Sequence, residues 1–168
     1  YGKSALVLGY LEAWLGKDSM DKAMKQYYEQ WKFKHPSPAD FRKAIETATG
    51  QQLDWLFNQL IESNQKLDYN IRSAKRITGS GGNDYRVRIR NLADVNGPVI
   101  LAAQRKDSTL STYLLSGAAQ IDTQLSLPTG ATHLQIDPLW QMPEINAKNN
   151  RYRLNAFAAR RSEEHTSE

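Results

Sequence analysis

The sequence predicts an α+β protein in which a four-helix segment is followed by a small antiparallel β-sandwich. Up to about residue 61 the apolar residues recur at the 3.6-residue period of helices, and from residue 67 they alternate at period two, as in strands with one wet face. A polar stretch at residues 62–66 separates the two patterns. Short strands divided by turns are typical of a sandwich. We therefore expect two domains, at residues 1–64 and 65–158.

The first helix is apolar on nearly every side. Between residues 5 and 15 only Gly9 and Glu12 interrupt the apolar run, and Gly16 suits the left-handed position just past a helix end. A helix that is apolar all round requires cover on every side. One explanation is a core helix of this domain alone. We favour another, that the chain is the C-terminal part of a larger protein whose preceding portion covers this helix.

The next three helices carry start and stop signals. Asp18 or Ser19 is expected to cap the second helix. The third begins with Ser37 as its cap and Pro38 at its first position, and it ends at Gly50. The inward stripes of the three helices are Met20, Met24, Tyr27, Tyr28 and Trp31; Phe41, Ala44, Ile45 and Ala48; and Leu53, Leu56, Phe57, Leu60 and Ile61.

The sandwich is predicted from alternating segments and from the turns between them. Tyr69 and Ile71 alternate with polar residues in the first strand, as Val87 and Ile89 do in the second. A glycine-rich loop at 79–84 lies between them. Such a loop holds phosphate when a helix follows it directly, but here a strand follows, so we interpret it as a hairpin turn. Further strands are expected at 99–103, 110–115, 121–127 and 132–136.

Composition excludes several classes of function. The chain of 168 residues has no cysteine, hence no disulfide framework and no thiolate metal site. Its formal net charge is +4, and the basic residues are spread along the sequence instead of forming a block with interleaved aromatics, which argues against nucleic-acid binding. No apolar run reaches eighteen residues, so no membrane span is expected.

The last residues of the chain do not resemble the rest of a folded domain. Residues 161–168 resemble the in-frame translation of a sequencing adapter. We therefore interpret 159–168 as an artefactual tail outside the fold.

No complete active site is evident in the sequence. A zinc hydrolase needs two histidines four residues apart on a helix and a third ligand. The chain has His35, His133 and His165, and none has another histidine four residues away. His35, beside Pro36, is interpreted as a capping residue and His133 as an ordinary strand residue. The sequence therefore predicts no metal ligands in this chain.

The first residues resemble a known family. Tyr1, Gly2, Lys3, Ser4 and Ala5, followed by Leu8, Leu11, Leu15 and Gly16, resemble the segment after the zinc site in the gluzincin aminopeptidases, the family of membrane alanyl aminopeptidase and leukotriene hydrolase. The resemblance extends over residues 1–62, especially to bacterial members. Ser4 departs from it, because the family usually has glycine there.

The resemblance implies the fold of both domains. The helices would be part of a thermolysin-like catalytic lobe, and the strands would form the β-domain of the bacterial enzymes. Less specific motif residues near the end of that domain are Asp137, Pro138, Pro143, Glu144, Asn146, Asn149 and Asn150.

The resemblance also implies a catalytic role for Tyr1. In the family this tyrosine hydrogen-bonds the oxyanion that forms when zinc-bound water attacks a peptide, and an ordinary phenol with a pKa of about 10 stays protonated for that task. The zinc ligands and general base would lie in a missing N-terminal portion, so this chain alone would be inactive. Peptides would be the substrates, and the family favours a periplasmic or membrane-associated location. The alternative for Tyr1 is an aromatic residue at a frayed chain start.

A second class of function remains open from the sequence. The helices and the sandwich could form a non-catalytic adaptor that binds another protein or a glycan. The reading frame upstream of Tyr1 distinguishes the two hypotheses. A helix with the pattern His-Glu-any-any-His supports the peptidase, and a start codon supports the adaptor.

Overall fold

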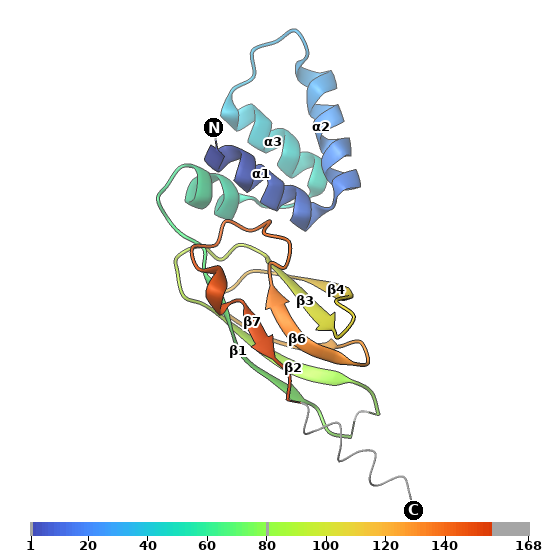
Figure 1. Cartoon of the computed structure of the whole chain (residues 1–168). Coiled ribbons are helices and arrows are strands. Elements are labelled where there is room, and N and C mark those ends of the chain that lie inside the picture. The colour runs from blue at the N-terminus through green and yellow to red at the C-terminus, as the bar shows by residue number, and fades with distance from the viewer. Residues whose placement is uncertain (1, 80, 156–168) are drawn as a thin grey trace, which may run out of the picture. The chain divides into compact units, whose positions relative to one another are not determined.

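The computed structural model describes residues 2–79 and 81–155, which form two compact units (Figure 1). Of the described residues, the first unit contains 2–66 and 141–143, and the second contains 67–79, 81–140 and 144–155. Two sequence-based interpretations, the role of Tyr1 and the tail at 159–168, lie outside the described residues.

The first unit is helical, and its four helices occur where the sequence predicts helices. They pack through buried apolar side chains and through edge-to-face aromatic pairs, such as Tyr10 with Trp55 and Tyr27 with Phe41, each with ring centroids 5.1 Å apart. Tyr10 is fully buried. The elements are α1 (Gly2–Leu15), α2 (Lys17–Trp31), α3 (Pro38–Thr49) and the π-helix η1 (Trp55–Ile61).

The start of α3 confirms the signature read from the sequence. The backbone N–H of Asp40 donates to the Ser37 hydroxyl over 3.2 Å, and the N–H of Ser37 donates to the Asp40 carboxylate over 2.8 Å, which is a complete capping box. Hydrogen bonds from Ser37 lower the pKa of Asp40. The helix ends, as predicted, at Gly50 in the left-handed conformation, with φ of 67°.

The predicted cap of α2 is wrong. The helix begins at Lys17, directly after Gly16, and has no side-chain cap. Gly16 has a φ of 85°, a conformation that glycine reaches without strain and that reverses the chain within one residue. Asp18 and Ser19 therefore lie inside the first turn of the helix instead of in front of it.

The fourth helix differs from the α-helix expected. In η1 the backbone N–H of Glu62 donates to the carbonyl of Phe57, five residues earlier, over 3.0 Å. Arg42 of α3 secures its start, donating to Asp54 over 2.5 Å and to Asn58 over 2.7 Å. Leu56, Phe57 and Leu60 are buried as the stripe predicted.

The second unit consists of two antiparallel sheets with strand orders β1-β2-β5 and β4-β3-β6-β7. Ile71, Val87 and Ile89 of the first sheet are buried, as are Leu134 and Ile136 of the second. The strands are β1 (Tyr69–Arg76), β2 (Asp84–Asn91), β3 (Val99–Arg105), β4 (Leu110–Leu115), β5 (Gln120–Ser126), β6 (Ala131–Ile136) and β7 (Arg151–Arg153), and the 3-10 helix η2 (Ala147–Asn149) precedes β7.

The hairpin of β1 and β2 and the four strands β3 to β6 match the strands expected from the sequence, but β7 was not anticipated. The glycine-rich loop joins the antiparallel strands β1 and β2, and its Gly79 and Gly81 have φ values of 87° and 69°. Strand β7 has only three residues and pairs with β6 at His133, Leu134 and Gln135. Three residues are too few for an alternating pattern to emerge from the sequence.

Replacing Ser37 by alanine removes the cap of α3. We expect the helical unit to lose about 1 kcal/mol of unfolding free energy, because the N–H of Asp40 then loses the Ser37 hydroxyl as an acceptor and keeps only the Ser37 carbonyl, at 3.1 Å. Urea unfolding followed by circular dichroism measures this loss. Ser19→Ala is the control, since Ser19 is exposed within α2. Equal stability of the two variants would show that the capping box contributes nothing.

Candidate functional site

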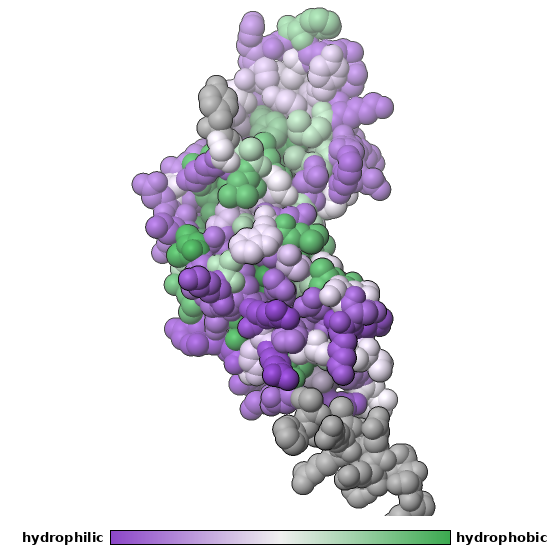
Figure 2. Space-filling model, viewed as in Figure 1, coloured by the Kyte–Doolittle hydropathy of each residue, from purple (hydrophilic) through white to green (hydrophobic). Residues whose placement is uncertain are grey.

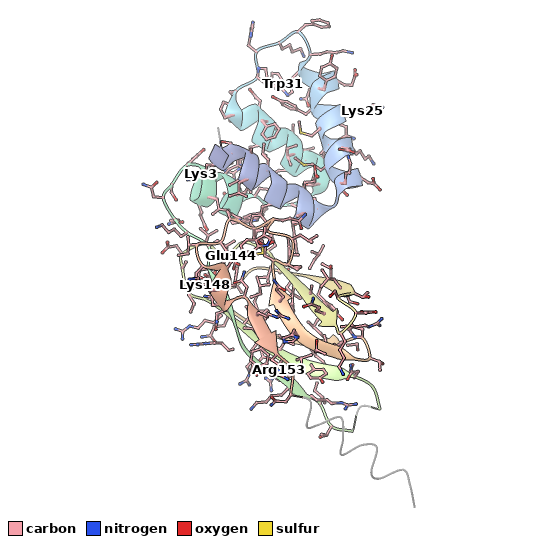
Figure 3. All side chains as sticks on the ribbon, viewed as in Figure 1. Lys3, Lys25, Trp31, Glu144, Lys148 and Arg153 are labelled. Carbon is pink, nitrogen blue, oxygen red and sulfur yellow. The ribbon has the colours of Figure 1, made fainter. Side chains whose placement is uncertain are left out.

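The segment that directly follows Tyr1 in the sequence is anchored by Lys3. The Nζ atom of Lys3 donates to the backbone carbonyl of Ser63 over 2.8 Å, linking residues sixty positions apart (Figure 3). Ser63 lies just after η1, so the bond joins the first turn of α1 to the end of the fourth helix. No chemical role for Lys3 was evident from the sequence, because its partner is a backbone atom that no side-chain motif reveals.

Helix α1 buries only one of its apolar sides. Val7, Tyr10 and Leu11 are at most 1% exposed, whereas Leu6 is 45% exposed. A methyl group placed on Gly9 would meet no atom within 4 Å. Hydrophobic side chains accordingly reach the surface around this helix in Figure 2. The described residues thus leave part of the apolar surface of α1 uncovered. A helix that is apolar on nearly every side normally packs that surface against other elements.

Neither described histidine forms part of a metal centre. His35 is exposed in the connection between α2 and α3. His133 lies on β6, with its Nδ1 atom 2.9 Å from the Thr132 hydroxyl, and burial together with the charges of Arg151 and Arg153 lowers its pKa. Within residues 2–79 and 81–155 no group of three or more His, Cys, Asp or Glu side chains could hold a metal ion. These residues therefore do not fit a zinc ion.

One finding concerns membranes. Among the described helices, none is both long enough and apolar enough to cross a bilayer.

Two of the motif residues near the end of the sandwich, Glu144 and Asn150, are joined at the carboxyl group of Glu144, which is labelled in Figure 3. Its Oε1 atom accepts the backbone N–H of Tyr69 over 2.9 Å, and its Oε2 atom accepts the carboxamide of Asn150. The backbone supports the same junction, since Leu67 forms a parallel bridge with Glu144 and accepts the N–H of Ile145. Glu144 thus holds the start of β1, seventy-five residues earlier in the chain.

Two further carboxyl groups influence Glu144. Asp68 and Asp137 are each 7% exposed. Burial of Glu144 is the main reason that its pKa rises to about 7, and the charges of Asp137 and Asp68 add to the rise, while the hydrogen bonds from Tyr69 and Asn150 oppose it. The side chain of Asn149 donates to Asp68 over 3.0 Å. The cluster therefore favours a neutral Glu144 in slightly acidic solution.

Asn150 suits both protonation states of Glu144. Asn150 is 3% exposed, and its Oδ1 atom has no hydrogen-bond partner while its amide nitrogen donates to Glu144. If the carboxamide turns over, Oδ1 can accept a hydrogen bond from the O–H of a protonated Glu144 carboxyl group. The pair thus retains a hydrogen bond when the carboxyl group gains a proton.

Comparison with known proteins finds a family model that is similar to the helical unit. Residues 1–60 match the Peptidase family M1 domain. This match confirms the resemblance of the first helices to the gluzincin aminopeptidases. No curated protein sequence matches the chain.

The fold of both units also occurs in a solved structure. The crystal structure of Legionella pneumophila aminopeptidase A in complex with aspartic acid is similar, with a TM-score of 0.68 and 16% sequence identity. The similarity covers 86% of this chain, and this chain spans only 17% of the length of that protein. The predicted α+β fold, helices followed by antiparallel sheets, is thereby confirmed.

Replacing Glu144 by glutamine tests the carboxyl cluster. Because the folded-state pKa lies above the ordinary 4.5, the wild-type carboxyl stabilises the fold below pH 4.5, and this contribution disappears as the pH rises through about 7. The loss is on the order of 3 kcal/mol, since a tenfold change in an ionisation constant corresponds to about 1.4 kcal/mol. Glutamine remains neutral, so the variant should lack this pH dependence.

Urea unfolding of both proteins between pH 4.5 and 8 measures the effect. Glu62→Gln is the control, because Glu62 is an exposed carboxyl group in the helical unit. An unchanged pH dependence in the Glu144 variant would assign the effect to another group.

Proposed function

We propose that the whole protein to which this chain belongs is a zinc aminopeptidase that removes N-terminal residues from peptides. The observation that carries the proposal is the match of residues 1–60 to the Peptidase family M1 domain. It favours a peptidase over the adaptor hypothesis, which has no comparable support. Peptides are accordingly the proposed substrates.

The surface of α1 supports the proposal that the catalytic domain extends beyond these helices. Leu6 is largely solvent-exposed and the space beside Gly9 is open, although the helix is apolar on that side. Apolar surface of this kind gains about 25 cal/mol for each Å² that another element covers. In the proposed whole protein, the rest of the peptidase domain packs there.

Tyr1 is the proposed catalytic residue. Its phenol would donate a hydrogen bond to the oxyanion formed as the peptide carbonyl is attacked. A donor placed where negative charge develops commonly lowers the barrier by about 2.7–4 kcal/mol. The bond between Lys3 and Ser63 supports this role indirectly, because it fixes the helical turn that follows Tyr1. Lys3 is thus a proposed positioning residue.

The proposed zinc ion needs ligands from other parts of the whole protein. Residues 2–79 and 81–155 contain no cluster of metal-ligating side chains that could hold it. The proposal therefore gives this chain the oxyanion donor and a structural domain, and it derives no step at the metal.

Replacing Tyr1 by phenylalanine in the whole protein tests the catalytic assignment. We expect kcat to fall by about 100- to 1,000-fold with little change in KM, because the lost hydrogen bond acts mainly in the transition state. Hydrolysis of an aminoacyl p-nitroanilide provides the measurement. Tyr28→Phe is the control, since Tyr28 on α2, which the sequence wrongly predicted to face inward, is 63% exposed. Wild-type kcat in the Tyr1 variant would refute the role.

The chain of 168 residues alone should lack activity. We expect metal analysis of the purified chain to give far less than one zinc per molecule, and no cleavage of the same reporter, because the described residues offer no zinc site. The whole protein is the positive control. Stoichiometric zinc in the chain alone would contradict the assignment of the ligands to other parts of the protein.

A further inference from the structure

The second unit contains a basic pocket that the peptidase proposal does not use. The pocket has a volume of about 570 Å³, and no aspartate or glutamate lines it. Its lining residues come from β1, from β2 and the loop before it, from β3 and the turn after it, from the start of β6, and from β7 and the residues after it. Five of them are basic: Arg76, Arg105, Lys106, Arg151 and Arg153. The fold thus gathers charges that are dispersed along the sequence.

None of these five cations belongs to an ion pair among the described residues. The cations of those ion pairs are Lys17, Lys32, Arg42, Arg86 and Arg88. The contact of Arg151 is with a neutral group, the side-chain oxygen of Gln104, over 3.4 Å. A nearby acid, Asp107, accepts the backbone N–H of Thr109 over 3.0 Å and does not line the pocket; hydrogen bonds from Thr109 and, to a smaller extent, the charge of Arg105 lower its pKa. The positive charge of the pocket is therefore not neutralised from within.

One of the guanidinium groups has a donor that lacks an acceptor. The Nε atom of Arg105 is buried and has no hydrogen-bond partner. Buried donors normally have partners, because an unsatisfied one loses its hydrogen bond to water without replacement. A bound acceptor in the pocket would satisfy this N–H.

His133 reports the electrostatic potential of the same region. It lies directly opposite Arg153 on β7 and Gln104 on β3, and it lines the pocket. Burial lowers its pKa, and the positive charges of Arg151 and Arg153 lower it further. The positive potential that disfavours a protonated His133 also attracts an anion to the pocket.

We propose that this pocket binds a diphosphate group, either as free pyrophosphate or as part of a nucleoside diphosphate. A single carboxylate carries one negative charge and would leave most of the five cations uncompensated. A diphosphate concentrates several charges on oxygens that guanidinium groups bind in a bidentate manner. The volume lies within the range of about 300–1,000 Å³ that is usual for small-molecule sites.

Isothermal titration calorimetry of the full chain with pyrophosphate tests the proposal, in phosphate-free buffer containing sodium chloride. The test variant combines Arg105→Gln and Arg153→Gln. We expect its affinity to fall about a hundredfold, because two charge-assisted contacts are lost. The control combines Arg72→Gln and Arg90→Gln, which removes the same charge from exposed strand positions outside the pocket. We expect it to bind within about twofold of wild type.

Other outcomes decide the remaining points. Absence of pyrophosphate binding, an equal loss in the control, or equally tight binding of sulfate would overturn the proposal. Tighter binding of ADP than of pyrophosphate identifies a nucleoside diphosphate, and equal or weaker binding identifies the free ion. If circular dichroism shows that the double variant is unfolded, Arg153→Gln alone serves instead, because Arg153 is exposed (Figure 3). It should weaken binding about tenfold, and wild-type affinity would overturn the proposal.

Discussion

The helical unit depends on the packing of its neighbours against the apolar helix α1. These neighbours cover only part of the apolar surface of α1. Tyr10 and Leu11 are fully buried and organise the helices around them, with Trp55 of η1 against the ring of Tyr10. The flank of the helix that carries Leu6 remains open. The same helix therefore stabilises the described unit and, in the proposed peptidase, provides a surface for further packing. Its first turn is held independently, by the bond from Lys3 to Ser63.

Features encoded locally were predictable from the sequence. Ser37 and Asp40 interact across three residues, so their capping box follows from the pattern alone. The α2 cap was mispredicted, because Gly16 allowed the helix to begin earlier. In the candidate site, Glu144 was among the motif residues of the sequence resemblance. Its contact with Tyr69 was not predictable, because only the tertiary fold brings the two residues together. The role of Tyr1 stays a prediction.

The basic pocket illustrates the same limit for charge. The even distribution of arginine and lysine along the sequence argued against nucleic-acid binding and did not indicate where positive charges converge in the fold. Yet Arg76 and Arg153, far apart in the chain, line one pocket together with Arg105. A count of charges along the sequence does not capture this, because the convergence depends on strand register. In particular, the pairing of β6 with β7 sets Arg153 opposite His133, and β7 was too short to predict.

The link between Glu144 and Tyr69 also bears on how the protein is made. During translation Tyr69 is added seventy-five residues before Glu144, and β7 is added later still. Until then the nascent sandwich lacks the junction at the start of β1 and one edge strand of its second sheet. The helices of the first unit all precede the sandwich in the chain, so they can form before Glu144 is added. Only residues 141–143 of that unit come later. Long-range closure of this type is slow compared with local helix formation, so the sandwich should be the later of the two to mature during translation.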